Sequence, residues 1–218
     1  MNELDQKVGW GPFNKDEQGT QQREIYVCTF SLIALLVGSD GDLSKEELQI
    51  ISQLIKQTLK LDDEKKSFVQ TVFNETKRTK VTFVEMVTRY KEALSDKTQM
   101  YTWLMDVLIR LALADSVYTE EEHSLLKIAC KTLGLPEDKI DKVASSYGKT
   151  DLSAYYVLLG LNKDADDETV NKAYQKLINE YDVDKLVEFG FAKELVTIAQ
   201  ERQSQYMEAF LKIRKTSE

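Results

Sequence analysis

Apolar residues recur every three or four positions through most of the chain from Glu24 onward. One stripe contains Leu48, Ile51, Ile55 and Leu59, a second contains Phe83, Met86, Val87 and Tyr90, and a third contains Trp103, Leu104, Val107, Leu108 and Leu111. This spacing is that of amphipathic α-helices. We therefore expect an all-α protein in which these stripes face a core.

Several helix ends can also be placed from the sequence. The stretches "SKEE" from Ser44, "TFVE" from Thr82 and "TEEE" from Thr119 all fit the Ser/Thr-x-x-Glu capping box. In that motif the hydroxyl and the carboxylate satisfy amides that would otherwise lack partners at a helix start. Gly134, followed by Pro136, indicates the end of one helix and the start of the next.

A weak internal repeat relates two parts of the chain. The stretches "LVGSDGDLSKEELQIISQLI" and "LALADSVYTEEEHSLLKIAC" superpose with Asp40 over Asp115 and Glu47 over Glu122. Each unit consists of a helix, a short acidic loop and a capped helix. Two such units with helices between them predict one helical domain over residues 24–147, which is within the usual size of a single domain.

The two ends of the chain differ from this central domain. Residues 1–23 have no periodicity, so we expect a flexible arm whose Trp10 and Phe13 dock on the body of the protein. A polar hinge at residues 146–153 leads into a third block, residues 148–218, in which two amphipathic stretches predict a helical hairpin.

Composition and charge narrow the function. The 218 residues carry a formal charge of −8, which argues against nucleic-acid binding because phosphate neutralisation needs clustered Lys and Arg. The longest apolar run, residues 26–38, is shorter than the roughly 20 residues of a transmembrane helix. No signal-peptide pattern opens the chain, so we expect a cytoplasmic protein.

No constellation of catalytic residues is recognisable. His123 is the sole histidine, no serine or cysteine has an orienting partner, and "GSDGD" lacks the spacing and lysine of a phosphate loop. Cys28 and Cys130 lie in apolar helical patterns, where a free thiol is usually a small core residue. We predict that the protein is not an enzyme and needs no cofactor.

The acidic loops raise one alternative, a divalent-cation site. A complete EF-hand is excluded because Leu36 and Gly38 stand where its first two ligands belong. If the two repeats face each other, however, four carboxylates could converge as oxygen ligands. They are Asp40, Glu47, Asp115 and Glu122. We weigh this hypothesis below the simpler interpretation that they are loop and capping groups.

The third block resembles a J-domain over almost its whole length. The matching positions are Tyr156, Leu159 and Gly160 at its opening, Lys172, Ala173, Tyr174, Lys176 and Leu177 in its second helix, and Ala209 and Phe210 in its third. The preceding block resembles the TerB-like (tellurite-resistance type) helical domain through its two acidic loops. In this order the chain is similar to the DjlA-type bacterial co-chaperones.

Two departures from the J-domain pattern bear on function. The resemblance implies a His-Pro-Asp tripeptide that triggers ATP hydrolysis by a DnaK-type chaperone, but this chain has Asp182-Val183-Asp184. Asp-Val keeps neither the donor-acceptor ring of histidine nor the fixed φ of proline. The second helix is also acidic, with four acids against two bases from Asp166 to Tyr181, and Gln175 stands where arginine is usual.

Three hypotheses follow. The first is a non-catalytic adaptor whose hairpin binds a DnaK-type chaperone or a true J-protein without activating it. Its partner-binding face would consist of Lys172, Gln175, Lys176 and Asn179. The second is a stress-linked cation-binding protein with a structural tail, and the third is an active co-chaperone with an atypical loop.

Overall fold

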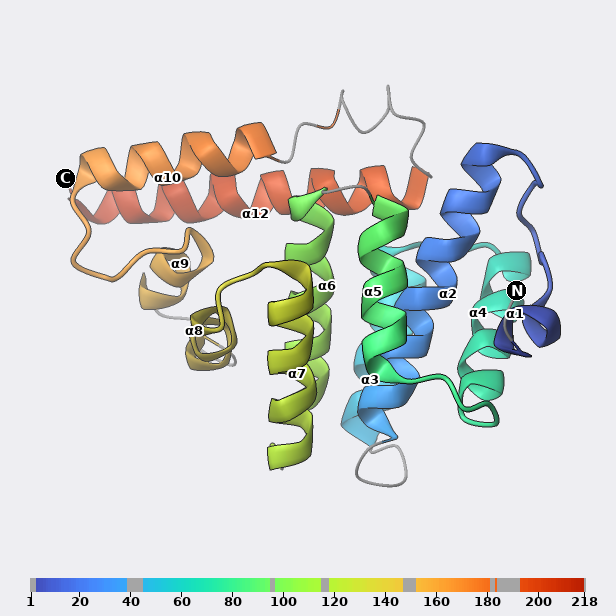
Figure 1. The fold of residues 1–218 in the computed structure, drawn as a ribbon. Coiled ribbons are helices and arrows are strands. Elements are labelled where there is room, and N and C mark those ends of the chain that lie inside the picture. The colour runs from blue at the N-terminus through green and yellow to red at the C-terminus, as the bar shows by residue number, and fades with distance from the viewer. Residues whose placement is uncertain are drawn as a thin grey trace. The chain divides into compact units, whose positions relative to one another are not determined.

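Every regular element in the described part of the chain is a helix, which confirms the all-α prediction. The computed structural model describes residues 3–38, 45–94, 97–114, 118–146, 152–180, 183 and 193–217. The chain divides into two compact units, Met1–Glu137 and Asp138–Glu218, and each is described by itself (Figure 1). The predicted domain boundary after residue 147 stays a prediction, because a division by packing does not fix where a family domain ends.

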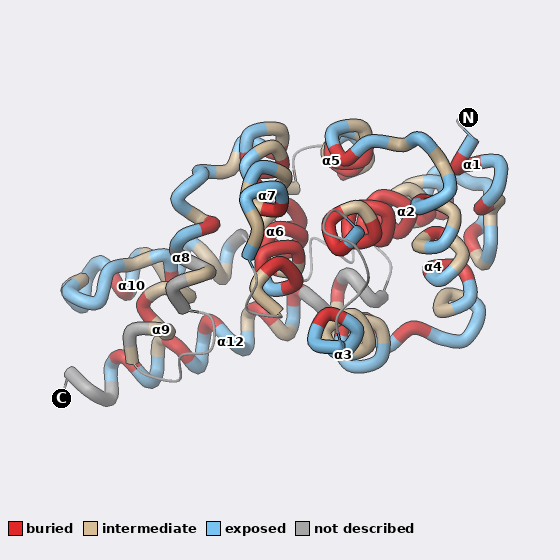
Figure 2. The backbone as a smooth tube through the Cα atoms, turned by 90° about the horizontal axis from the view of Figure 1, so that it is seen from below, coloured by how far each residue is buried: buried red, intermediate tan, exposed pale blue. Residues whose placement is uncertain are grey.

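Helix α2 is the centre of the first unit. In chain order this unit contains α1 (Glu3–Val8), α2 (Glu17–Val37), α3 (Lys45–Gln53), the π-helical turn η1 (Leu54–Thr58), α4 (Asp63–Thr76), α5 (Phe83–Leu94), α6 (Thr98–Ala112) and α7 (Glu120–Leu133). Helices α4, α5 and α6 all pack against α2, whose C-terminal half is buried nearly all round (Figure 2). A helix that is apolar on every side needs such an enclosure.

Two of the predicted stripes face this core. Phe83, Met86, Val87 and Tyr90 of α5 are all buried, as are Trp103, Leu104, Leu108 and Leu111 of α6, with Val107 half-buried. The Tyr90 hydroxyl donates to the Met100 carbonyl at 3.1 Å, so this buried phenol has its polar end satisfied. Side-chain periodicity therefore predicted the inner faces of α5 and α6.

The first stripe is partly wrong, and a π-helical turn explains why. Leu48 on α3 is 50% exposed, whereas Leu54 and Leu59 are buried. The Leu59 amide donates to the Leu54 carbonyl at 2.8 Å, a five-residue spacing, so the turn contains one residue more than an α-helical turn. Because of this extra residue, the side of α3 that faces the core is not the side that a strict α-helical period predicts.

The predicted helix ends agree with the structure where it describes them. At α7 the full capping box is present: the Glu122 amide donates to Thr119 Oγ1 at 3.1 Å, and the Thr119 amide donates to Glu122 Oε2 at 2.9 Å. At α5 the Glu85 amide donates to Thr82 Oγ1 at 3.2 Å. Gly134 ends α7 with φ of 73°, a left-handed conformation that favours glycine. Ser44 lies outside the described residues.

The expectation of a flexible arm is wrong for residues 3–23. Leu4 and Val8 of α1 and Phe13 after it are buried, and α1 packs against α4. The Phe13 ring lies 5.1 Å from the ring centroids of both Tyr26 and Phe68. The segment lacks periodicity because it is short and is held by a few anchors rather than by one continuous helical face. Docking of Phe13 on the body agrees with what the sequence favoured.

The second unit contains the predicted hairpin. Its described helices are α8 (Asp138–Ser146), α9 (Leu152–Leu158), α10 (Asp167–Glu180) and α12 (Lys193–Ser217). Helices α10 and α12 lie side by side, and α9 packs on α12 (Figure 1). Along α12 a buried stripe at three- and four-residue spacing runs through Val196, Ala199, Arg202, Tyr206, Ala209 and Ile213. This stripe is the long inner face of the unit.

Candidate functional site

The candidate partner surface is built on α10. Asp166 starts the helix by accepting a hydrogen bond from the Thr169 amide at 2.8 Å, and the bonding to Thr169 holds the pKa of the Asp166 carboxyl below its usual range. Glu168 and Lys172, one turn apart, form an ion pair of 2.6 Å on the solvent side. These local contacts give a short amphipathic helix with a defined outer face.

The inner face of α10 is held to α12 by one aromatic pair and one hydrogen bond. The rings of Tyr174 and Phe210 stack with centroids 4.4 Å apart and planes 13° apart. The Gln203 side chain donates to the Ile178 carbonyl at 3.5 Å. Because the residue numbers rise along α10 while those of its partners fall along α12, the two helices are antiparallel.

The large apolar and aromatic residues that match the J-domain pattern divide into two groups by burial. Tyr156 and Leu159, at the end of α9, are buried. Tyr174, Leu177 and Phe210 are half-buried, because a two-helix layer leaves the edge of each helix open to solvent. Ile140, Val170 and the stripe along α12 are also buried.

All four residues predicted to contact a partner are exposed on α10. They are Lys172, Gln175, Lys176 and Asn179. Their spacing of three and four residues puts them along one side of the helix, so a partner could contact all of them at once. Exposure is necessary for this role and does not by itself assign a partner, so the binding role stays a prediction.

The loop that follows α10 is described at a single one of its three marked positions. Val183 has helical backbone and a half-buried side chain, whereas Asp182 and Asp184 lie outside the described residues. A half-buried valine is consistent with the apolar character of its side chain. The loss of the histidine and the proline is a matter of residue type and does not depend on the conformation of the loop.

The predicted cation site is described at two of its four positions. Glu47 and Glu122 are each 3% exposed, whereas Asp40 and Asp115 lie outside the described residues. Glu122 Oε2 accepts from both the amide and the hydroxyl of Thr119, at 2.9 and 3.0 Å, as the capping interpretation requires. Within the described ranges no three His, Cys, Asp or Glu side chains gather as a metal centre. The cation site stays a prediction.

The remaining candidate side chains have structural surroundings. The Tyr118 hydroxyl lies 2.7 Å from His123 Nδ1 on the surface of the first unit. Neither Cys28 nor Cys130 forms a disulfide, and both are buried, as the sequence indicated. Burial, and then the neighbouring Glu24, raises the pKa of the Cys28 thiol well above its ordinary value, so this thiol is a poor nucleophile.

A charged cluster that the sequence did not reveal fastens the N-terminal segment. Arg89 Nη2 donates to Asp5 Oδ1 at 3.0 Å, and Arg89 Nε and Nη2 donate to the two carboxylate oxygens of Glu24 at 2.5 and 2.8 Å. Arg23 lies 3.2 Å from Asp5 Oδ1 and donates through Nε to the Gly9 carbonyl at 2.7 Å. The one hint of this cluster in the sequence is that two charged residues, Arg23 and Glu24, stand at the start of an apolar run.

The cluster has a clear electrostatic effect on Asp5. Burial alone would raise the pKa of this carboxyl, but the hydrogen bond and charge of Arg89, followed by those of Arg23, outweigh burial and lower it. Arg89 responds in the same way: burial acts to lower its pKa, and Glu24 and Asp5 raise it further above its ordinary range. Both shifts favour the charged forms of Asp5 and Arg89.

Comparison with protein families identifies both parts of the chain. The profile of tellurite resistance protein TerB matches residues 27–145. A second profile, a repeated domain in UCH-protein, matches residues 152–212, the stretch that resembles a J-domain. The assignment of residues 152–212 as a degenerate J-domain stays a prediction.

Individual relatives agree with the resemblance seen in the sequence. A protein named "Co-chaperone protein DjlA" from Vibrio vulnificus (strain YJ016) is 26% identical, covering 95% of this chain and 82% of its own. Its namesakes from Aliivibrio fischeri and Shewanella oneidensis are each 24% identical, over 91% and 92% of this chain and 80% and 79% of theirs. No solved structure matches. Among the described helices none is long and apolar enough to cross a membrane.

Proposed function

Given that this chain belongs to the tellurite resistance protein TerB family, we propose that it is a co-chaperone-related adaptor, which binds partners through its hairpin without stimulating the ATPase of a DnaK-type chaperone. The resemblance to proteins named co-chaperone protein DjlA over most of both chains supports the co-chaperone part. The finer part, binding without activation, rests on α10 and the loop after it.

One observation carries the proposal: α10 keeps an ordered, exposed face, while the tripeptide after it is replaced. Lys172, Gln175, Lys176 and Asn179 face solvent on a helix that its own cap and the Tyr174–Phe210 stack hold in place. The following residues are Asp-Val-Asp. A binding surface can therefore persist where the triggering group of a J-domain has been lost.

Charge supports the loss of triggering. Asp182 puts a carboxylate where a J-domain has an imidazole, and the Glu168–Lys172 pair leaves Lys172 partly neutralised. The rate of association steered by a basic helix falls when the helix as a whole becomes acidic. Steering depends on the summed field of all its charges rather than on one residue. We therefore expect that both the loop and the charge of α10 limit stimulation of the chaperone ATPase.

A single-turnover ATPase assay with a purified DnaK-type chaperone tests the proposal. Four full-length proteins are compared: the unmodified chain, a loop variant (Asp182→His with Val183→Pro), a helix variant (Gln175→Arg with Asn179→Lys) and the combination. We expect no stimulation by the unmodified chain, little by the loop variant, and more by the combination than by either alone. Robust stimulation by the unmodified chain would overturn the proposal in favour of an active atypical co-chaperone.

A second candidate function is divalent-cation binding by the first unit. The observation in its favour is that Glu47 and Glu122, equivalent positions of the two repeats, are both almost completely buried. A cation shared with the two acidic loops would lower the free-energy cost of burying these two carboxylates, in addition to the contacts that each already makes in the protein. We rank it second because capping already accounts for Glu122.

A further inference from the structure

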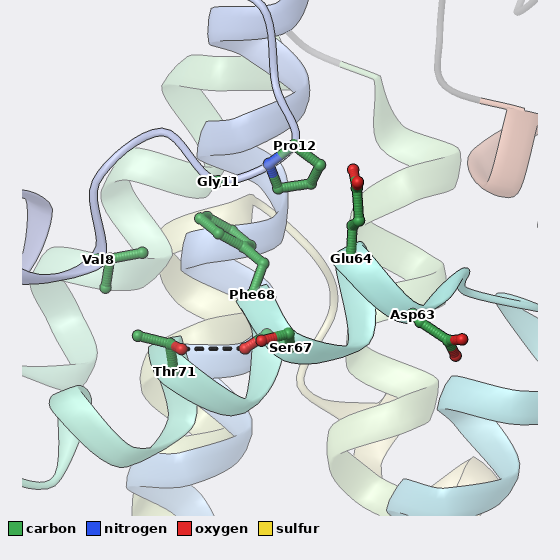
Figure 3. A pocket seen from close by; sticks show the side chains of 8 residues that line it. All are labelled: Val8, Gly11, Pro12, Asp63, Glu64, Ser67, Phe68 and Thr71. Atoms are coloured by element: carbon green, nitrogen blue, oxygen red, sulfur yellow. Dashed lines mark hydrogen bonds between the residues drawn. The ribbon is translucent and has the colours of Figure 1, made fainter.

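A pocket of about 600 Å³ lies between the segment after α1 and the first turns of α4 (Figure 3). Its apolar side comes from Val8, Pro12 and Phe68. Its polar side comes from Asp63, Glu64, Ser67 and Thr71. All of these residues belong to the first unit. The pocket thus combines an apolar surface with two carboxylates and two hydroxyl groups, and Asp63 is already paired with Lys66.

The apolar side of the pocket is rigid. Phe68 is 4% exposed, and its ring meets the Phe13 ring edge-on at 5.1 Å. The backbone passes directly over this ring at Gly11, where φ is +53° and an added Cβ would lie 2.1 Å from Phe68 Cδ2. Glycine is therefore required at this position, and the floor is preformed rather than made on binding.

Glu64 gives the pocket its charge. The neighbouring carboxylates are engaged on their own helix, since Lys66 Nζ lies 3.0 Å from Asp63 Oδ1 and Asp62 Oδ1 accepts from the Lys65 amide at 2.8 Å. Glu64 is exposed, and no described residue forms an ion pair with it. Figure 3 shows Glu64 extending beside Pro12, whereas Asp63 points away from the Phe68 ring.

The start of α4 could instead favour an anion, because the N-terminal end of a helix carries partial positive charge. Asp62 at the cap and Asp63 and Glu64 in the first turn already compensate this end with three carboxylates. The formal charge of the whole chain, −8, acts in the same direction. The pocket therefore selects a cation.

We propose that this pocket binds an arginine or lysine side chain in a basic segment of a partner protein. The aliphatic stem of such a side chain would lie on Pro12, at the rim above the buried Phe68 ring, and its charged head would reach Glu64. Long basic side chains divide in this way between apolar and polar surroundings. Arginine fits better than lysine, since its planar fork can contact the carboxylate and the Ser67 hydroxyl together.

This site does not depend on the proposed function, because no residue of the hairpin takes part in it. Loss of peptide binding would leave the ATPase expectations untouched, and the reverse also holds. The two proposals therefore fail separately.

Fluorescence anisotropy with the full-length protein tests the site. The probe is a fluorescein-labelled Gly-Leu-Arg-Leu-Gly peptide, and the control peptide has citrulline, which is neutral and nearly the same shape, in place of arginine. We expect binding of the arginine peptide that weakens as salt is added, and weaker binding of the citrulline peptide. Equal binding of both peptides, or no binding of the arginine peptide at millimolar protein, would overturn the proposal.

Two matched variants locate the binding. Glu64→Gln should weaken binding about two- to fivefold, as expected for one partly exposed ion pair. Glu121→Gln changes the same charge at the equivalent second position of α7 and should have no effect. Ser67→Leu should fill the pocket and abolish binding, with unchanged circular dichroism confirming its fold. Equal losses in the Glu64 and Glu121 variants would show a general charge effect and contradict the site.

Discussion

Asp5 lies 3.0 Å from Arg89 although 84 positions of chain separate them. The contact joins the first helix to α5, and Glu24 on α2 accepts hydrogen bonds from Arg89 Nε and from the same Nη2 that contacts Asp5. The geometry uses both the Nε and the Nη2 donors of Arg89, so it depends on a planar fork and not only on positive charge. The N-terminal segment is thereby part of the packed unit.

Arg89→Lys should therefore lower the free energy of unfolding, by about 1–3 kcal/mol, because lysine keeps the charge but cannot contact Glu24 and Asp5 together. Urea denaturation followed by circular dichroism measures this change. Arg78→Lys is the matched control: Arg78 pairs with Glu75 on an exposed helix end, and its replacement should leave the midpoint unchanged. Equal effects at the two positions would contradict a special role for the fork.

Acid should weaken the attachment of α1. Since the pKa of Asp5 in the folded protein is below its ordinary value of 3.8, Asp5 contributes stability above that pH and loses it as the pH falls through the folded pKa. Asp5→Asn should thus be less stable than the unmodified protein at pH 6, with the difference shrinking below pH 4. Thermal unfolding from pH 2 to 7 tests this, and a difference that stays constant with pH would argue against it.

The two faces of the hairpin should respond differently to alanine. Tyr206→Ala, in the buried stripe of α12, should destabilise the second unit by about 2–5 kcal/mol. Joint replacement of Lys172, Gln175, Lys176 and Asn179 by alanine should keep the fold and weaken binding to a purified J-protein or DnaK-type chaperone in a pull-down. Gln200→Ala, on the exposed side of α12, serves as the control. Unchanged binding by the fourfold variant would remove α10 as the contact surface.

Cation binding has a direct calorimetric test. Titration with Ca²⁺, Mg²⁺ and Mn²⁺ should release or absorb heat, and the bound cation should raise the melting temperature by mass action. Asp40→Asn with Asp115→Asn should abolish both effects if the acidic loops supply ligands. No heat at millimolar cation, or heat that survives the double replacement, would eliminate the second candidate function.

Local signals in the sequence predicted local structure well. The Thr119–Glu122 capping box and the left-handed Gly134 each depend on residues within one turn, so their sequence is sufficient to place them. The inner faces of α5 and α6 follow from strict periodicity. The prediction that Leu48 is buried was wrong because η1 inserts one residue into the helical period. Nothing in the sequence of residues 54–58 marks a π-helical turn.

Contacts between distant residues could not be predicted. Arg89 has the spacing of an ordinary outer residue of α5, and its pairing with Asp5 and Glu24 exists only once α1, α2 and α5 have packed together. The half-burial of Tyr174 likewise depends on how many helices cover α10. For the candidate site, the sequence correctly predicted that Lys172, Gln175, Lys176 and Asn179 are exposed, whereas their binding role stays a prediction. The pocket beside Phe68 could not be predicted because it depends on where an aperiodic segment folds back.

The enclosure of α2 has a consequence for the nascent chain. Helix α2 is completely synthesised once Val37 has been added. Two of the helices that cover it, α5 and α6, are complete only at Leu94 and Ala112. While those residues are being translated, the apolar surface of α2 is exposed, and it can form non-native contacts with other apolar surfaces. A protein related to co-chaperones thus resembles a chaperone client during its own synthesis.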